Sequence, residues 1–477
     1  MSTGATTYWC EYAQLPEGTR PSVRITVGEI GVSLWPSYGA QRPQTHADLL
    51  EGRIGPRILS IESTPAEPGD VRLPGVTMPA FANTHSHAFH RALRGRTHDQ
   101  DGTFWTWRDR MYHVATQLDP ENYLALARAT YAEMALAGIT AVGEFHYVHH
   151  NPDGTPYDDP NEMGKALQQA ARDAGIRLCL LDTCYLAGGL TADGHTELSP
   201  QQRRFGDKDV MAWADRVSRL ETDHGRSTIA TAMHSVRAVP FDQLSAAANV
   251  ASHVCDGTWI NTPLHIHLSE QPAENEAALA YYGRTPTQLL TDAQLLDRNL
   301  TAVHATHLTD TDIALLGRAN AHASFCPTTE RDLADGIGPA KALRDSGVQL
   351  TLGSDQHAVI DMFEEMRAVE MHDRLRTNER GHFSPNELLD FATGYASIGF
   401  GEIGSLAVGQ HADFISVRLD SPRTAGSHPA QIAFSATAAD VHAVVTSGEQ
   451  IVSDGQHRLG DVGRLLTDAI APFWEDA

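Results

Sequence analysis

The stretch Phe81-Ala-Asn-Thr-His-Ser-His-Ala-Phe-His90 decides the fold. The apolar run 74–82 predicts a buried strand, and the arginine-rich residues that follow the stretch predict a loop. His85 and His87 lie two positions apart, and side chains at i and i+2 of a strand point to the same side. Both imidazoles are therefore expected to converge at the C-terminal end of one strand, as two ligands of a metal ion would. The alternative is that both are ordinary polar residues of a loop, since the chain has 25 histidines. Further ligand candidates elsewhere in the sequence must decide between the two interpretations.

From about residue 76 the sequence repeats a strand, a loop and a helix. Eight apolar runs have the length of buried strands: 80–87, 141–148, 177–185, 228–236, 264–269, 301–307, 321–326 and 348–354. Helical patterns lie between them at 121–137, 162–174, 210–220, 286–295, 310–319 and 339–345. This alternation predicts an α/β fold, a (β/α)8 TIM-like barrel, because doubly wound open sheets usually have fewer strands.

Both ends of the chain read as β structure. Short strands separated by Gly, Pro and Glu turns are predicted at 7–13, 23–27, 31–35 and 57–61. After helical patterns at 362–376 and 385–393, strands return at 413–417 and 441–446. We expect these two sets to pair. The predicted organisation is residues 1–75 and 403–477 as the two parts of one small β-sandwich, and 76–402 as the barrel.

Composition restricts the class of partner. At 477 residues with 41% hydrophobic residues the chain can bury a large core, and no apolar run approaches the roughly 18 residues that span a bilayer. The N-terminus lacks a charged and an apolar leader region, so we expect a cytoplasmic protein. A net charge of −24 argues against nucleic acid and anionic membrane surfaces as partners. A small anionic substrate stays possible, because the local charge of a pocket can oppose the net charge. We also expect a homodimer.

The cysteines show no pattern of a disulfide or a metal site. Their number is odd and their spacing irregular, which favours buried free thiols. They are Cys10, Cys179, Cys184, Cys255 and Cys326.

Polar side chains stand where a barrel places its functional groups, at the C-terminal ends of strands. His267 ends the fifth predicted strand, and Glu270 follows in the loop. His304 belongs to the sixth strand, and Asp355 lies at the rim of the eighth. Histidines and an aspartate at strand ends suit a hydrolytic zinc ion that keeps one position open for water. One such residue alone is a weak signal, but several on one rim are a strong one.

The same residues resemble the amidohydrolase superfamily. The motifs are His85-Ser-His87, His267-x-x-Glu270, His304, Gly353-Ser-Asp355 and the tail from Gly404 to Phe414. Three further stretches, Phe104 to Tyr112, Glu144 to His150 and His234-Ser-Val-Arg237, resemble the formimidoylglutamate deiminases within it. The resemblance runs over most of the chain. It implies a zinc enzyme of histidine degradation that hydrolyses N-formimidoyl-L-glutamate to N-formyl-L-glutamate and ammonia.

The resemblance implies a role for each of these residues. His85, His87, His267 and Asp355 would hold the zinc, and Glu270 and His304 match the proton-transfer pair. Asp355 and His304 would receive or stabilise the proton lost by the attacking water, and Glu270 would pass one to the departing nitrogen. One zinc per chain is expected, because no lysine stands at the end of strand four, where binuclear relatives carry a bridging one. The lysines are Lys165, Lys208 and Lys341.

For the substrate the family pattern points to Arg108, Tyr147, His234 and Arg237. The substrate carries two carboxylates, and guanidinium groups hold carboxylates with two parallel hydrogen bonds. A single arginine, taken alone, is more often a solvated surface charge. His90 departs from the pattern, which has glutamine there, so the substrate contact at this position differs from the family's.

Other residues near these motifs have simpler interpretations. His146, His149 and His150 could form a second metal cluster, but structural roles are favoured. His307 is expected in the core or behind the ligands, and His357 either lines the pocket or is structural. Trp105 and Trp107 would be pocket walls or packing residues in the long loop after strand one.

Two other functions compete with the deiminase. A zinc deaminase acting on an aromatic base, such as guanine or an adenosine derivative, would need stacking surface in place of two arginines. A barrel without activity, serving as an assembly scaffold, would be free to lose its ligands. This chain keeps every ligand candidate together with Glu270 and His304, which speaks against a scaffold.

Overall fold

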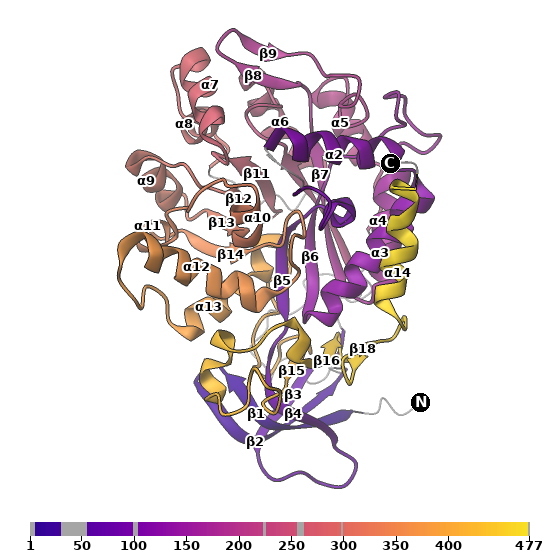
Figure 1. The fold of residues 1–477 in the computed structure, drawn as a ribbon, viewed down its shortest axis with the longest axis vertical. Coiled ribbons are helices and arrows are strands. Elements are labelled where there is room, and N and C mark those ends of the chain that lie inside the picture. The colour runs from indigo at the N-terminus through magenta and orange to yellow at the C-terminus, as the bar shows by residue number, and fades with distance from the viewer. Residues whose placement is uncertain are drawn as a thin grey trace.

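The computed structural model describes residues 5–29, 55–98, 104–222, 226–254, 262–296 and 299–475. Its main body is a ring of parallel strands surrounded by helices, and a second sheet lies below it (Figure 1). The second sheet combines indigo strands from the N-terminal end with yellow-orange strands from the C-terminal end. Two predicted features, the strand at 31–35 and Cys255, fall outside the described residues.

Eight parallel strands form the body, in the order β14-β13-β12-β11-β10-β7-β6-β5. Every predicted strand is confirmed to within a few residues, because apolar runs buried on both faces of a parallel sheet are readable from sequence. A parallel bridge between Ser86 and Asp355 joins the two outer strands, so the sheet closes as a barrel. The strands are β5 Phe81–Ser86, β6 Ile139–His146, β7 Arg177–Cys184, β10 Ser227–Met233, β11 Leu264–Leu268, β12 Leu300–His304, β13 His322–Phe325 and β14 Gln349–Leu352.

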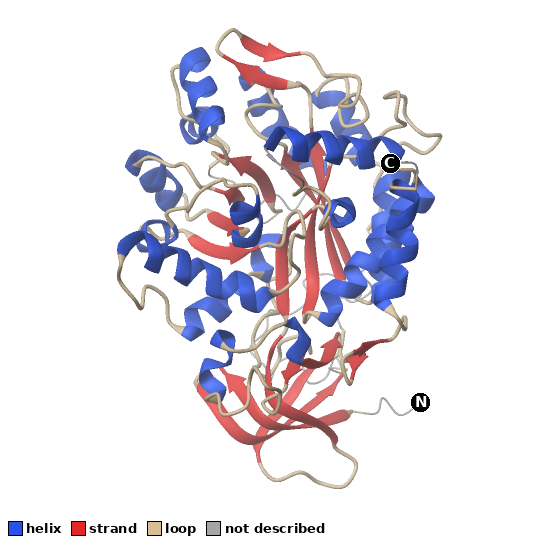
Figure 2. Cartoon of the chain, in the orientation of Figure 1, coloured by secondary structure: helices blue, strands red, loops and turns tan. Residues whose placement is uncertain are grey.

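Helices cover the outside of the barrel (Figure 2). The predicted helices are all present, as α3 Pro120–Leu136, α4 Glu162–Ala174, α5 Val210–Val217, α8 Pro286–Asp292, α9 Asp310–Arg318, α11 Ala340–Asp345, α12 Met362–Thr377 and α13 Pro385–Ala392. Further helices, which the sequence patterns did not single out, are α6 Phe241–Val254, α7 Pro272–Tyr282, α10 Pro327–Asp332 and α14 Val462–Ile470. The last of these packs beside α3 on the barrel (Figure 1).

The segment after strand one was predicted to be a loop, and this prediction was wrong. Residues Phe104–Gln117 form the helix α2. Its aromatic and threonine residues have low helix propensity, and charged residues break its apolar pattern. Trp107, Met111 and Val114 are nonetheless buried at helical spacing. Tertiary packing therefore decides the conformation.

The second sheet has the order β18-β17-β16-β15-β4-β1-β2-β3. Its central pair joins the two ends of the chain, because β15 lies antiparallel to β4. The predicted pairing of terminal strands is confirmed, whereas the division into segments at residues 75 and 402 stays a prediction. The strands are β1 Thr6–Leu15, β2 Gly18–Gly28, β3 Arg57–Ser63, β4 Val71–Pro79, β15 Phe414–Val417, β16 Val441–Thr446, β17 Glu449–Ser453 and β18 Gln456–His457.

The apolar run 74–82 was read as one strand but passes from one sheet to the other. β4 ends at Pro79 in the terminal sheet, and β5 starts at Phe81 in the barrel. Proline lacks the N–H that a ladder needs, so a strand within a sheet tends to end at such a residue. The strand that carries His85 and His87 is thus a direct continuation of the terminal sheet.

A buried ion pair joins the barrel to the terminal sheet. The Arg177 guanidinium at the start of β7 donates to Asp413, with Nη2 and Oδ1 3.1 Å apart. The side chains are 4% and 0% exposed. Asp413 also accepts the backbone N–H of Ser447 at 2.9 Å. These contacts explain why an aspartate stands in the tail motif.

Two further predictions concern the cysteines and the membrane. Cys10, Cys184 and Cys326 are buried free thiols, as expected, and Cys179 is buried as well. Among the described residues, no helix combines the length and the apolar character needed to cross a bilayer.

We predict that Asp413→Asn lowers the stability of the folded chain, because it leaves the Arg177 charge buried without a compensating anion. Breaking one side of such a pair costs on the order of 3 kcal/mol. Thermal and denaturant unfolding measure the change. Asp420→Asn is the matched control, since Asp420 pairs with Arg418 at the exposed surface and exposed pairs contribute little. Equal unfolding midpoints for both variants would contradict the prediction.

Candidate active site

Four predicted ligand side chains meet at the C-terminal end of the barrel. His85 Nε2 lies 3.4 Å from Asp355 Oδ1, and His87 Nε2 lies 3.5 Å from the same oxygen. His267 Nε2 lies 3.3 Å from His85 Nε2. All four side chains are buried. Two overlapping groups could each hold a metal ion: His85 with His87 and Asp355, and His85 with His267 and His304.

Hydrogen bonds to main-chain carbonyls orient two of these imidazoles. His87 Nδ1 lies 2.9 Å from the Phe145 carbonyl oxygen, and His267 Nδ1 lies 2.9 Å from that of His234. A carbonyl only accepts, so each Nδ1 carries the proton and each Nε2 presents its lone pair. Burial lowers the pKa of all three histidines, that of His85 to about 3. Neutral imidazoles with converging lone pairs are the form that binds a cation.

Carboxylates surround His304. Its Nε2 lies 3.9 Å from Glu270 and 3.8 Å from Asp355, and its Nδ1 lies 3.5 Å from Glu330. Burial opposes protonation, but Glu270, Glu330 and Asp355 together raise the pKa of His304 to about 10. His304 is thus suited to hold a proton between acidic partners. Sequence reasoning missed Glu330, which lies on α10, because no motif marks it.

The rim of the barrel is built from residues with left-handed backbone. The values of φ are +67° at His304, +42° at Asp355 and +60° at His357. Residues other than glycine rarely adopt this conformation, and it accumulates at functional sites, where the surrounding structure imposes it. Here it turns the chain sharply at the ends of β12 and β14, which keeps the side chains over the barrel mouth.

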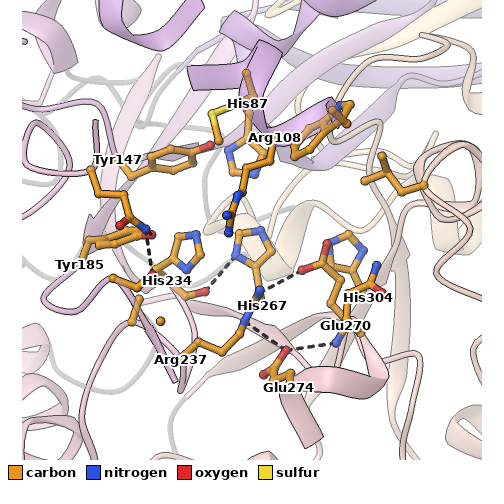
Figure 3. A pocket seen from close by; sticks show the side chains of 18 of the residues that line it. His87, Arg108, Tyr147, Tyr185, His234, Arg237, His267, Glu270, Glu274 and His304 are labelled. Carbon is orange, nitrogen blue, oxygen red and sulfur yellow. Dashed lines mark hydrogen bonds and ion pairs between the residues drawn. The ribbon is translucent and has the colours of Figure 1, made fainter. Parts of the chain in front are cut away.

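A cavity of about 380 Å³ opens above the ligands. Figure 3 shows Arg108 pointing down into it, with Arg237 on the opposite side beside Glu270 and Glu274. His85 is fully buried and is absent from the lining of the cavity. The predicted site residues that line it are His87, His90, Arg108, Tyr147, His234, Arg237, His267, Glu270, His304 and Asp355.

Two carboxylates contact Arg237. Its Nη2 lies 3.0 Å from Glu270 Oε2, and its Nε lies 3.5 Å from Glu274 Oε2. Glu274 is fully buried on the first turn of α7. Sequence reasoning missed it, although its spacing of four from Glu270 was a possible signal. The pair keeps the guanidinium at the cavity wall and links it to the predicted proton-transfer residue.

His90 and Tyr147 form one wall of the cavity. His90 Nε2 lies 3.1 Å from the Tyr147 hydroxyl, and the His90 ring contacts Trp107 edge to face at 5.3 Å. The side chain of Trp105 lies outside the described residues, but Trp107 lines the pocket as predicted.

Three aromatic rings of the pocket rest on Phe205, which is 1% exposed. Its ring centroid lies 5.1 Å from that of Tyr147, 5.7 Å from Tyr185 and 6.2 Å from Tyr112. The neighbouring Arg204 is buried and donates to the Ala115 and Leu118 carbonyls and, at 2.9 Å, to that of His150. These contacts attach α2 to the loop after β6. They place Arg108 over the cavity.

Histidines beside the site have structural contacts. His357 bonds Ser354 Oγ at 2.9 Å and Ser86 Oγ at 3.2 Å, behind the ligands. His307 Nε2 donates to the Asp335 carbonyl at 2.7 Å.

The histidines after β6 belong to a buried ionic network. His146 and His149 lie near Asp182, close enough for a shared cation. Both oxygens of Asp182 already accept from the Arg216 guanidinium, at 2.8 and 2.9 Å. His149 Nε2 donates to the Thr183 carbonyl at 3.0 Å, and His150 lies 3.3 Å from Asp207. The positive Arg216 disfavours a second cation there, which supports the predicted structural role.

Comparison with known proteins agrees with this geometry. Formimidoylglutamate deiminase from Pseudomonas aeruginosa is 34% identical over 466 residues, 94% of this chain and 95% of the relative. A 5-methylthioadenosine/S-adenosylhomocysteine deaminase from Natronomonas pharaonis is 27% identical, over 94% of this chain and 96% of its own. The crystal structure of an amidohydrolase from Brucella melitensis superposes with a TM-score of 0.81 at 29% identity, covering 98% of this chain and 99% of that one.

The family profile described as amidohydrolase family matches residues 76–451, which include the whole barrel. The two curated relatives are named as a deiminase and a deaminase, which are hydrolases that act on C–N bonds. The chain therefore belongs to the amidohydrolase family and is an enzyme related to formimidoylglutamate deiminase.

Proposed function

We propose that this enzyme hydrolyses N-formimidoyl-L-glutamate to N-formyl-L-glutamate and ammonia, a step of histidine degradation. One observation carries the proposal. Arg108 and Arg237 line the same cavity as the ligand cluster, in a protein of net charge −24. Two guanidinium groups suit a substrate with two carboxylates. The likeness to the Pseudomonas aeruginosa deiminase supports the same substrate.

We propose that one zinc ion per chain is held by His85, His87, His267 and Asp355. Zinc–nitrogen bonds of 2.0–2.1 Å separate tetrahedral ligand atoms by about 3.3–3.4 Å. Three of the separations between these four donor atoms, 3.3, 3.4 and 3.5 Å, agree with this spacing. Three imidazoles and a carboxylate are donors that zinc prefers. When bound, the ion activates water for attack at neutral pH.

The chain's own residues would supply the proton transfers. Water attacks the amidine carbon, and Asp355 would receive the proton that it loses, with His304 3.8 Å away to stabilise it. Glu270 lies between His304 and Arg237 and would pass a proton to the departing nitrogen. Ammonia leaves only if this nitrogen is protonated, so the transfer to it is required for turnover.

The remaining predicted residues would hold the substrate. Arg108 and Arg237 would bind its carboxylates, and Tyr147 and His234 complete the wall between them. His90 stands where the family pattern has glutamine. It contacts the Tyr147 hydroxyl, so it can influence the substrate by positioning that hydroxyl. The homodimer, the cytoplasmic location and the absence of nucleic acid as partner stay predictions.

An aromatic-base deaminase is the second candidate. The relative from Natronomonas pharaonis is a deaminase named for adenosine derivatives, and Trp107, Tyr112 and Tyr185 add aromatic surface to the pocket. Against it, a neutral base offers no carboxylate to the two arginines that line the cavity.

We predict that the purified enzyme releases ammonia from N-formimidoyl-L-glutamate in preference to other formimidoyl amino acids, guanine and adenosine derivatives. Arg108→Met or Arg237→Met should lower kcat/KM for it by roughly ten- to a few hundred-fold, because a carboxylate loses a charge-assisted pair. The same variants should discriminate less against substrates without a side-chain carboxylate.

Steady-state kinetics over this panel measure both effects. Arg203→Met is the control, since Arg203 is exposed beside the buried Arg204. A parent enzyme that prefers guanine would make the aromatic-base deaminase the better proposal.

We predict that Glu270→Gln lowers kcat by about 10²–10⁴-fold, the usual contribution of a proton-transfer group. The amide keeps the shape of the side chain but cannot carry the proton. The control is Glu276→Gln, at an exposed position of α7. Metal analysis of the same samples is needed, because loss of the metal in the Glu270 variant would make Glu270 a ligand.

We predict one tightly bound zinc ion per chain in elemental analysis. His267→Ala and Asp355→Ala should lose it, because three donors remain of the four that fit. His146→Asn tests the other histidine cluster and should retain the ion. A zinc content near two ions per chain, or loss of the ion from the His146 variant alone, would contradict the prediction, because it would mean that the His146 cluster binds a metal ion.

A further inference from the structure

Tyr185 occupies the pocket wall between the two arginines. It follows β7 directly, is 6% exposed and lines the cavity. Its ring contacts that of His234 at 4.5 Å (Figure 3). The charges of Arg237 and Arg108 both act on its hydroxyl group. No motif of the sequence pointed to this residue.

The amide of Gln202 has only one possible orientation. Its Oε1 accepts the backbone N–H of Ser199 at 2.9 Å, and its Nε2 donates to the Gly188 carbonyl at 2.9 Å. Backbone groups have fixed polarity, so exchanging the amide oxygen and nitrogen would break both bonds. The second hydrogen on Nε2 is therefore directed at the Tyr185 hydroxyl, whose oxygen lies 2.9 Å away.

This hydrogen bond determines whether the Tyr185 hydroxyl can donate or accept on its other side. Because its oxygen accepts from Gln202, its hydrogen must point elsewhere. Within the described part of the chain, the contact with Gln202 is the only hydrogen bond of this hydroxyl group. Burial raises the pKa of Tyr185, and the nearby Arg237 and Arg108 only partly offset this, so the hydroxyl stays protonated at neutral pH. A donor hydrogen therefore faces the cavity, beside two cationic groups.

We propose that Tyr185 donates this hydrogen to a carboxylate oxygen of the substrate, and that Gln202 is the residue that positions it. The inference rests on the proposed function for the identity of the substrate. The two guanidinium groups and the hydroxyl are then all donors. A carboxylate, which only accepts, matches these three donors better than a carboxamide, which presents two hydrogens of its own.

Tyr185→Phe removes the hydroxyl and keeps the ring on Phe205. In the zinc-loaded enzyme, kcat/KM for N-formimidoyl-L-glutamate should fall about ten- to hundredfold, as for a lost hydrogen bond to a charged group. The loss should appear in KM with kcat nearly unchanged, because the contact is made equally in the bound substrate and the transition state. Tyr282→Phe is the control, since that hydroxyl is also hydrogen-bonded but lies outside the pocket.

Gln202→Glu tests the positioning role by reversing the polarity at Tyr185. A carboxylate oxygen in place of Nε2 accepts the hydroxyl hydrogen and turns it away from the cavity, so the loss should be at least that of Tyr185→Phe. Because Gln202 lines the cavity, the added charge also repels the anionic substrate, and the neutral Gln202→Leu is therefore the variant compared in the Tyr185→Phe background. Its smaller loss should vanish there. A loss for Gln202→Leu that persists in that background would overturn the positioning role.

Calorimetric binding of glutarate, a dicarboxylate without a reactive nitrogen, separates this inference from the proposed function. Tyr185→Phe should bind glutarate about ten- to hundredfold more weakly than the parent. If the parent turns over N-formimidoyl-L-glutamate and Tyr185→Phe equals it in kinetics and binding, the inference fails and the proposed function stands. If the parent does not turn it over but Tyr185→Phe weakens glutarate binding, the proposed function fails alone. A parent that neither binds glutarate nor turns over the substrate overturns both.

Discussion

Barrel closure is the constraint on which the site depends. The Asp355 N–H donates to the His85 carbonyl at 3.0 Å, and the His87 N–H donates to the Asp355 carbonyl at 3.2 Å. These two bonds join β5 to the chain after β14, so the residues that close the barrel are the ones that supply ligands. Any opening of this seam would separate His85 and His87 from the Asp355 carboxylate. The hydrogen bonds that close the barrel therefore also fix the relative positions of these three side chains.

The pocket contains positive side chains although the whole molecule carries a negative net charge. The chain carries −24, yet Arg237 and Arg108 face the cavity, and the buried Glu274 holds the first of them. Arg237 also contacts Glu270. The group suited to a substrate carboxylate thus touches the group assigned to proton transfer. An arriving anion competes with Glu270 for the same guanidinium, which couples recognition to the acid–base chemistry.

Most of the framework and the centre of the site could be predicted. All eight barrel strands are buried apolar runs, and His85, His87, His267 and Asp355 occupy their C-terminal ends, where parallel strands of a barrel bring them together. The helix α2 was missed, because packing and not local propensity holds it. The supporting residues were missed for another reason. Glu330 and Gln202 carry no spacing relation to the motifs, since a short helix and a loop bring them in from distant parts of the chain. Tyr185 directly follows β7, but its position at a strand end did not by itself single it out.

The amino-acid sequence by itself determined the barrel and the pairing of the terminal strands, and it singled out the side chains that we propose as metal ligands. Alternation of buried runs and the position of polar residues at their ends are local properties, so they can be read in order along the chain. Only the tertiary structure decided which way the Tyr185 hydroxyl donates and which carboxylates hold Arg237 and His304. Such facts depend on hydrogen-bond polarity and on distances between segments up to tens of residues apart, and these exist only when the chain is folded.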